Sequence, residues 1–251
     1  MTFESLGLAP EILRAVADEG YTAPTPIQTE AIPHVIAGRD VLAAAQTGTG
    51  KTAAFVLPIL QLLRGSANTS FSPARHPVRA LILTPTRELA MQIAGSVKAY
   101  GRHVPLRSAL VYGGVPMDPQ VKELMAGGEI LVPTPGRLLD HVGSKTANLS
   151  MVEILVLDEA DRMLDMGFIR DIRRVIELLP ARRQNLLFSA TFSDEIRSLA
   201  EGLLNRPATV DVAPRNTAAE LVEQVVIPVD RHKSEEHTSE LQSHSFISYA
   251  V

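Results

Sequence analysis

The sequence of 251 residues predicts an α/β fold in which helices cover both faces of a parallel sheet. Short apolar runs alternate along the chain with longer amphipathic segments, as strands alternate with helices in such folds. The runs are aliphatic at nearly every position, which indicates strands buried on both faces. Glycine-rich, hydroxyl-rich or acidic segments follow four of them, and ligands of such sheets bind beyond the carboxyl ends of the strands. We therefore expect a ligand site at that edge.

The pattern assigns the elements in chain order. The predicted strands are Asp40–Ala44, Arg79–Leu83, Arg107–Val111, Glu129–Val132, Ile154–Leu157, Asn185–Ser189 and Ala208–Val212. The predicted helices are Lys51–Leu63, Arg87–Tyr100, Pro135–Gly143, Phe168–Leu178 and Asp194–Leu203. Gly65 to Pro77 is rich in Ser, Pro and Gly, which predicts a surface loop. One domain is expected over residues 1–212, followed by a linker at 213–220 and a further strand within 221–233.

Composition excludes several classes of protein. Cysteine is absent, which excludes disulfides and zinc–thiolate sites and favours a cytoplasmic location. The sequence contains no run of about 18 apolar residues, so no membrane span is predicted. The first ten residues lack the pattern of a secretory signal. The net charge of −4 gives no support for nucleic-acid binding, so local residues must carry any such prediction.

A phosphate-binding loop is predicted between the first strand and the helix that begins at Lys51. Gly50, Lys51 and Thr52 fit the end of the pattern G-x-x-x-x-G-K-[ST], while Ala45 replaces its leading glycine. Backbone N–H groups of Thr47, Gly48, Thr49 and Gly50 would face phosphate oxygens. Lys51 would add a charge, and the Thr52 hydroxyl would bind Mg²⁺. The alternative is a glycine-rich helix cap, but a strand leads in and a helix leads out.

An acidic segment, Asp158 to Asp161, follows the predicted strand Ile154–Leu157. Its alternative interpretation is an acidic first helical turn that complements the helix dipole. Paired with Lys51, it instead predicts Asp158 as a Mg²⁺ ligand through water and Glu159 as the base that orients an attacking water. The two segments together predict a nucleoside triphosphatase that uses Mg²⁺.

Five further motifs follow in order: Gly20 to Gln28, Pro85-Thr86-Arg87-Glu88-Leu89, Gly113-Gly114, Thr134-Pro135-Gly136-Arg137 and Ser189-Ala190-Thr191. With Asp158-Glu159-Ala160-Asp161, they make residues 3 to 230 resemble the DEAD-box ATP-dependent RNA helicases, and within them the RhlE-like bacterial subgroup. The resemblance implies a RecA-like P-loop domain, with an adenine-reading Q motif in residues 1–29.

The resemblance also implies roles for individual residues. Gln28 would pair with adenine N6 and N7, and Phe3 would stack on the base. Sequence-nonspecific contacts to the RNA backbone would come from Pro85, Thr86, Arg87, Gly113, Gly114, Thr134, Pro135, Gly136 and Arg137. Asp161, Ser189 and Thr191 would couple hydrolysis to unwinding. Each has a plainer alternative: a helix start for Gln28, a core position for Phe3, an N-cap for Thr86, turns for Gly113-Gly114 and Thr134–Arg137, and a helix cap for Ser189. Pro133 departs from the family, which carries a small residue there.

The family's second domain supplies arginine fingers in a segment like H-R-x-G-R-x-x-R, which this sequence lacks. Leu221–Val229 resembles the first strand of that domain, but residues 234–251 do not continue the pattern. A back-translation of Ser234 to Ser243 is similar to a sequencing-library adapter, so we expect a non-native tail at 234–251. The intact protein is then expected to unwind RNA, and this chain alone to bind nucleotide weakly. The alternatives are another P-loop ATPase, such as a DNA motor, or a fragment that only binds RNA or a partner. No particular protein partner is indicated.

Overall fold

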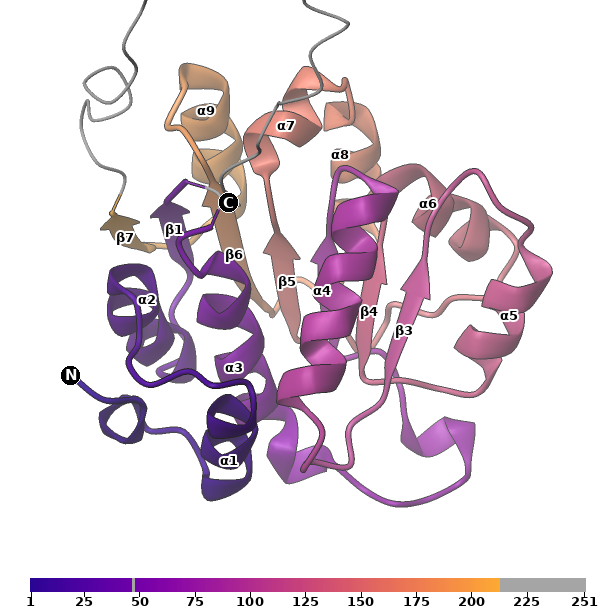
Figure 1. Cartoon of the computed structure of the whole chain (residues 1–251). Helices are drawn as coiled ribbons and strands as arrows, with labels where there is room; N and C mark the ends of the chain where they lie inside the picture. The colour runs from indigo at the N-terminus through magenta and orange to yellow at the C-terminus, as the bar shows by residue number, and fades with distance from the viewer. Residues whose placement is uncertain (47, 213–251) are drawn as a thin grey trace, which may run out of the picture. The chain divides into compact units, whose positions relative to one another are not determined.

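The computed structural model describes residues 1–46 and 48–212 (Figure 1). The predictions for residues 213–220, 221–233 and 234–251 lie outside this part of the chain. In it, seven strands form one sheet in the order β3-β4-β2-β5-β6-β1-β7, and every pair of neighbouring strands is parallel. The strands are β1 (Val41–Ala44), β2 (Ala80–Leu83), β3 (Ser108–Val111), β4 (Ile130–Pro133), β5 (Ile154–Leu157), β6 (Gln184–Ser189) and β7 (Ala208–Asp211). The predicted parallel sheet is confirmed: β5 has the predicted bounds, and each of the other strands is displaced by one residue at one or both ends.

The helices include all five that the pattern predicted. Those are α3 (Lys51–Leu63), α4 (Arg87–Tyr100), α6 (Pro135–Gly143), α8 (Ile169–Glu177) and α9 (Asp194–Leu203). The pattern did not assign bounds to α1 (Pro10–Asp18), α2 (Pro26–Ile36), α5 (Asp118–Met125) and α7 (Ala160–Asp165). The last two have eight and six residues and bury few of them, so their apolar periodicity is weak. None of the helices in the described residues is long and apolar enough to cross a membrane.

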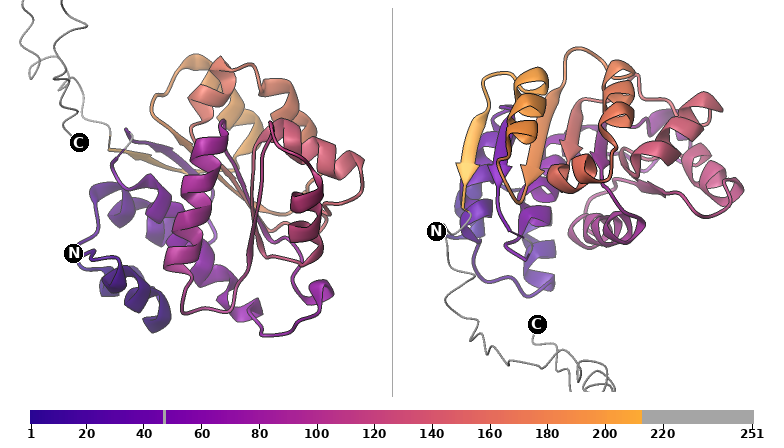
Figure 2. Two further views of the ribbon diagram at one scale, coloured as in Figure 1. Left: turned by 45° about the vertical axis from the view of Figure 1, so that its right-hand side comes forward. Right: turned by 90° about the horizontal axis from the view of Figure 1, so that it is seen from above.

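The sheet separates two apolar cores. Side chains of a strand alternate between its faces, so in β2 Ala80 and Ile82 join one core while Leu81 and Leu83 join the other. Helices α1 to α4 complete the first core, and α6 to α9 complete the second. Figure 2, seen from above, shows the helices on both sides of the strands. This burial on both faces explains why the strands are apolar at nearly every position.

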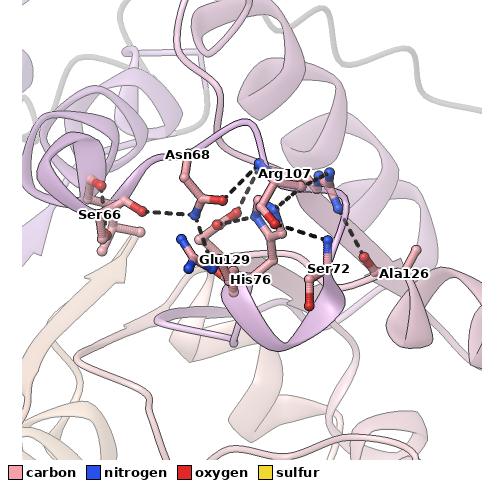
Figure 3. A network of polar contacts seen from close by, with 10 residues as sticks. Ser66, Asn68, Ser72, His76, Arg107, Ala126 and Glu129 are labelled. Carbon is pink, nitrogen blue, oxygen red and sulfur yellow. Dashed lines mark hydrogen bonds and ion pairs between the residues drawn. The ribbon is translucent and has the colours of Figure 1, made fainter.

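The segment between α3 and β2, predicted as a surface loop, contains the 3₁₀ turns η2 (Arg64–Ser66) and η3 (Pro73–Arg75) and is held by a buried ion pair (Figure 3). His76 Nδ1 lies 2.6 Å from Glu129 Oε1, and both side chains are fully buried. His76 Nε2 donates to the carbonyl of Ser70 (2.8 Å), which also accepts from the Arg107 guanidinium (2.6 Å). The other Glu129 oxygen accepts from the Arg107 backbone N–H (2.9 Å). The segment is therefore anchored to the start of β3 and β4, although its composition is that of a loop.

Candidate active site

The order of the strands sorts the predicted motifs into two adjacent groups at one edge of the sheet. The neighbours β5, β6 and β1 end in the acidic segment, in Ser189 and in the predicted phosphate loop. The neighbours β3, β4 and β2 end before Gly113, Thr134 and Pro85. Because all these strands run in one direction, their carboxyl ends share an edge. The nucleotide motifs therefore lie side by side, next to the motifs with predicted RNA contacts.

The predicted phosphate loop leaves β1 and enters α3 through two left-handed glycines. Ala45 N donates to Ser189 O (3.1 Å), and the Thr49 hydroxyl closes the turn by donating to Gln46 O (2.7 Å). Gly48 has φ 83° and Gly50 has φ 94°, a region that favours glycine. The loop thus delivers its chain to the N-terminus of α3, where free N–H groups attract anions. Thr47 lies outside the described residues.

Two charges of opposite sign lie in the cavity beside this loop. The cavity has a volume of about 460 Å³, and Lys51, Thr52, Asp158 and Glu159 are among the residues that line it. Lys51 is 7% exposed, and its buried ammonium has no hydrogen-bond partner among the described residues. Burial raises the pKa of Asp158 to about 7, against the opposing effect of Lys51. A buried cation without a partner favours an anionic ligand, so Lys51 fits a phosphate group. A cation next to Asp158 would favour its ionised form.

Gln28 lies in the wall of the same cavity but makes hydrogen bonds within the protein. Its side chain is 4% exposed. Its Oε1 accepts from Thr25 N (3.0 Å), and its Nε2 donates to Gly50 O (3.1 Å). The first bond is that of a helix-capping residue at the start of α2, which is the plainer alternative from the sequence. The second ties this helix to the phosphate loop. The amide oxygen keeps a second lone pair and the amide nitrogen a second hydrogen, so the same side chain could bind adenine without losing these bonds.

The acidic segment begins with a strained residue. Glu159 has φ 50° and ψ 51°, a left-handed conformation that is uncommon for a residue with a side chain. Its N–H donates to Asp158 Oδ1 (3.0 Å), and its carboxylate accepts from Arg162 (3.2 Å). This turn leaves Asp158 at the end of β5 and directs the chain into α7. Backbone strain of this kind is concentrated at functional sites.

Asp161 connects the acidic segment to the end of β6. Its Oδ2 accepts from Ala190 N (3.0 Å) and from the Thr191 hydroxyl at a long 3.5 Å. The Ser189 hydroxyl is buried and accepts from Thr191 N (3.3 Å), so it does not contact Asp161. Of the two hydroxyls that could have reached Asp161, therefore, one does. Ser193, and not Ser189, caps α9.

Among the motifs with predicted RNA contacts, Arg137 has hydrogen-bond donors to spare. It donates from Nη2 to Val115 O (2.8 Å), and its Nε lies 3.6 Å from Asp140 Oδ2 in an ion pair, but its Nε and Nη1 are buried without a hydrogen-bond partner in the described chain. Arg87 is exposed and lies over the ring of Tyr112, 5.0 Å from its centre. Thr86 accepts from Leu89 N (3.3 Å) as the N-cap of α4, as its plainer alternative proposed. Pro133 is the last residue of β4, and its carbonyl accepts from Thr84 N (3.1 Å).

Several positions differ from what the sequence alone suggests. Phe3 is 4% exposed within the first core and is not among the residues that line the cavity. Tyr21 and Tyr100 do line it, and their hydroxyls are 3.0 Å apart. Tyr21 lies in a motif that the sequence singled out, whereas no pattern signals Tyr100 at the end of α4. Gly113 and Gly114 are exposed in the turn after β3.

Comparison with known proteins gives one consistent result. The model of the DEAD/DEAH box helicase family matches residues 25–199. The DEAD-box ATP-dependent RNA helicase RhpA of Helicobacter pylori is 41% identical over 235 residues, which are 94% of this chain and 46% of that protein. CshA of Bacillus cereus, of the same description, is 40% identical over 92% of this chain and 43% of its own length. A crystal structure of a DEAD box protein from Methanococcus jannaschii superimposes with a TM-score of 0.77 at 35% identity, covering 97% of this chain and 64% of that one. The chain thus spans less than half the length of these curated relatives.

Proposed function

The chain belongs to the DEAD/DEAH box helicase family, and from this premise we propose that it is the nucleotide-binding half of an ATP-dependent RNA helicase. The observation that carries the proposal is a pair of cations with unused donors where the parallel strands end. The Lys51 ammonium and two nitrogens of the Arg137 guanidinium lack hydrogen-bond partners among the described residues, one cation in each group of motifs, although Arg137 also forms an ion pair with Asp140. Each is suited to a phosphate group, the first to one of ATP and the second to one of an RNA strand.

For the nucleotide, the proposal gives each residue a separate task. Lys51 and the N–H groups from Gly48 to Thr52 would bind the phosphates, and Thr52 and Asp158 would hold Mg²⁺. Magnesium, when bound, neutralises charge that develops on the phosphate oxygens. Glu159 would orient a water and accept its proton, after its carboxylate leaves Arg162. Gln28 would select adenine, and Phe3 as a stacking partner remains a prediction from the resemblance.

For the nucleic acid, the proposed contacts are to the sugar-phosphate backbone. Arg137, Arg87 and the exposed turn at Gly113-Gly114 lie after adjacent strands, so one strand of RNA could pass over all three. Such contacts hold RNA without reading its bases. Asp161 and Thr191 would transmit the state of the nucleotide to this surface. A cytoplasmic location and membership of the RhlE-like subgroup are parts of the same proposal.

Turnover of ATP with and without RNA tests the proposal. The protein that contains this chain should hydrolyse ATP faster with single-stranded RNA than with DNA of the same sequence, and Glu159→Gln should abolish turnover while nucleotide binding persists. Arg137→Ala should reduce stimulation by RNA without changing nucleotide affinity. Equal stimulation by DNA would refute the specificity for RNA, and RNA-independent turnover would favour another P-loop ATPase. The chain alone should show little turnover, because its sequence lacks the arginine-finger segment.

A further inference from the structure

A second cavity, of about 780 Å³, lies at the amino ends of the parallel strands, whereas the candidate active site lies at their carboxyl ends. It is formed by the segments that precede β1, β6 and β7, so it lies at the amino ends of these parallel strands. Four arginines from the three segments line it, and we call it the arginine pocket: Arg39, Arg182, Arg183 and Arg206. No residue of the nucleotide or RNA motifs belongs to it.

The pocket is built around a buried carboxylate that serves the fold. Asp40 accepts from the backbone N–H groups of Asn185 and Asn205, both at 2.8 Å, and thereby joins the three segments. None of the four arginines forms an ion pair with Asp40 among the described residues. Arg183 donates from Nε to Asn185 Oδ1 (2.9 Å) and from Nη1 to Pro180 O (2.8 Å). The floor of the pocket is therefore fixed by hydrogen bonds that leave none of the four arginines in an ion pair within the described chain.

The charge of the pocket contrasts with that of the chain. Four arginines and one aspartate line it, a formal charge of +3, whereas the whole chain carries −4. Arg182 and Arg206 are exposed and make no hydrogen bond or ion pair within the described chain, and Arg39 donates only to His34 Nδ1 (3.4 Å). Arg206 also has φ 46°, a left-handed conformation that glycine or asparagine would adopt with less strain. An arginine held in a strained conformation beside three others indicates a binding role.

We propose that the arginine pocket binds phosphate groups, and that these belong to the RNA backbone beyond the part held at the carboxyl edge. Guanidinium groups match phosphate oxygens with two parallel hydrogen bonds. No aromatic side chain of the described residues lines the pocket, so bases have no surface to stack on, and contact is restricted to the backbone. The choice of RNA rests on the proposed function, whereas the phosphate chemistry rests on the arginines alone. The same chemistry would suit a small anion such as pyrophosphate.

The test compares RNA binding by two variants that each remove two positive charges. Arg182→Ala with Arg206→Asn changes the pocket, and asparagine tolerates the left-handed backbone. Arg14→Ala with Arg170→Ala is the control, because both residues are exposed on other helices and form no hydrogen bond or ion pair with described residues. Affinity for single-stranded RNA is measured by fluorescence anisotropy across a series of salt concentrations. Thermal melts verify that both variants remain folded.

The pocket variant should bind long RNA about tenfold more weakly than the control, for every sequence tested. The slope of log affinity against log salt should fall by about 0.7 for each phosphate that the pocket no longer binds. An RNA that is only long enough to contact the motifs at the carboxyl ends of the strands should bind both variants equally. The charge-conserving variant Arg182→Lys with Arg206→Lys should retain most of the affinity for long RNA. Equal affinity of the pocket and control variants for long RNA would overturn the inference.

Two further outcomes separate the sources of phosphate. If pyrophosphate protects the control variant from thermal unfolding more than it protects the pocket variant, but both double variants bind long RNA equally, the pocket takes small anions and its assignment to RNA is wrong. If the unaltered chain binds no RNA even at low salt, the proposed function itself fails. If Arg137→Ala weakens binding of short RNA while the pocket variant has no effect on long RNA, the proposed function stands and only this inference fails.

Discussion

Alanine at position 50 would place a methyl group where the phosphate loop has no room for one. A Cβ on Gly50 would lie 2.4 Å from Gln28 Nε2 and 2.9 Å from Thr25 Oγ1, both closer than van der Waals contact. Gly50 also has φ 94°. The Gly50→Ala substitution therefore combines a strained backbone with the displacement of the buried Gln28 amide.

The magnitude follows from these two contributions. A residue other than glycine whose backbone is left-handed destabilises the fold by about 1–2 kcal/mol. Displacing Gln28 breaks its hydrogen bonds to Thr25 N and Gly50 O, and a buried polar group left unsatisfied costs about 1–3 kcal/mol. We expect the free energy of unfolding to fall by the sum of the two, about 2–5 kcal/mol, and nucleotide affinity to fall with it. Gly48→Ala is the matched control, because Gly48 has φ 83° but, apart from its chain neighbours, no atom of the described residues lies within 4 Å of the place that its Cβ would occupy.

Urea unfolding of both variants measures the difference, with unchanged slopes indicating that only stability has altered. Gly48→Ala should lose only the backbone contribution, about 1–2 kcal/mol. In a Gln28→Ala background the extra loss from Gly50→Ala should shrink to the part due to the Thr25 Oγ1 contact, because the clashing amide is gone. Equal losses for Gly48→Ala and Gly50→Ala would refute the contact between the helix α2 and the loop.

Three other predictions concern buried polar groups. The folded-state pKa of Asp158, about 7, lies above its ordinary value of 3.8. Between these two values the folded state holds a proton that the unfolded state has released, so the free energy of unfolding falls as pH rises toward 7. Asp158→Asn should therefore stabilise the nucleotide-free chain more at pH 8 than at pH 5 in thermal melts; a constant difference would contradict this. Glu129→Ala leaves His76 buried without its partner and should lower the free energy of unfolding in urea by about 3–5 kcal/mol, and a loss below about 1 kcal/mol would show that the pair contributes little. Burial and then the Tyr21 hydroxyl raise the pKa of Tyr100, so Tyr21→Phe should lower that pKa in an ultraviolet titration, and an unchanged pKa would exclude the hydrogen bond.

The sheet could be predicted closely because its strands are buried on both faces. The run Ile154–Leu157 is aliphatic at every position and fully inside the sheet, and its bounds were predicted without error. Helices α5 and α7 were missed because they are short and bury only one and two residues. The anchoring of His76 by Glu129 was also missed, since the two residues are 53 positions apart and a polar segment between Gly65 and Pro77 has the composition of a free loop.

The residues of the candidate active site could be named from the sequence, but their partners could not. A motif identifies Lys51, Asp158 and Arg137, whereas the absence of a hydrogen-bond partner on the Lys51 ammonium, and on two nitrogens of Arg137, is a property of the folded part of the chain that the structure describes. The hydrogen bond from Gln28 to Gly50 joins two motifs that the sequence presents as separate. Tyr100 is brought beside Tyr21 only by the packing of α4.

The grouping of strand ends along the edge has a consequence for how such a protein diversifies. Loops that leave β3 and β4 can lengthen or change composition without altering β5, β6 and β1, because the two groups meet only where β2 and β5 pair. Loops tolerate such change far better than buried strands do. Descendants of one ancestral gene can therefore acquire different targets while their chemistry for nucleotides stays the same, a modularity that the sheet order itself provides.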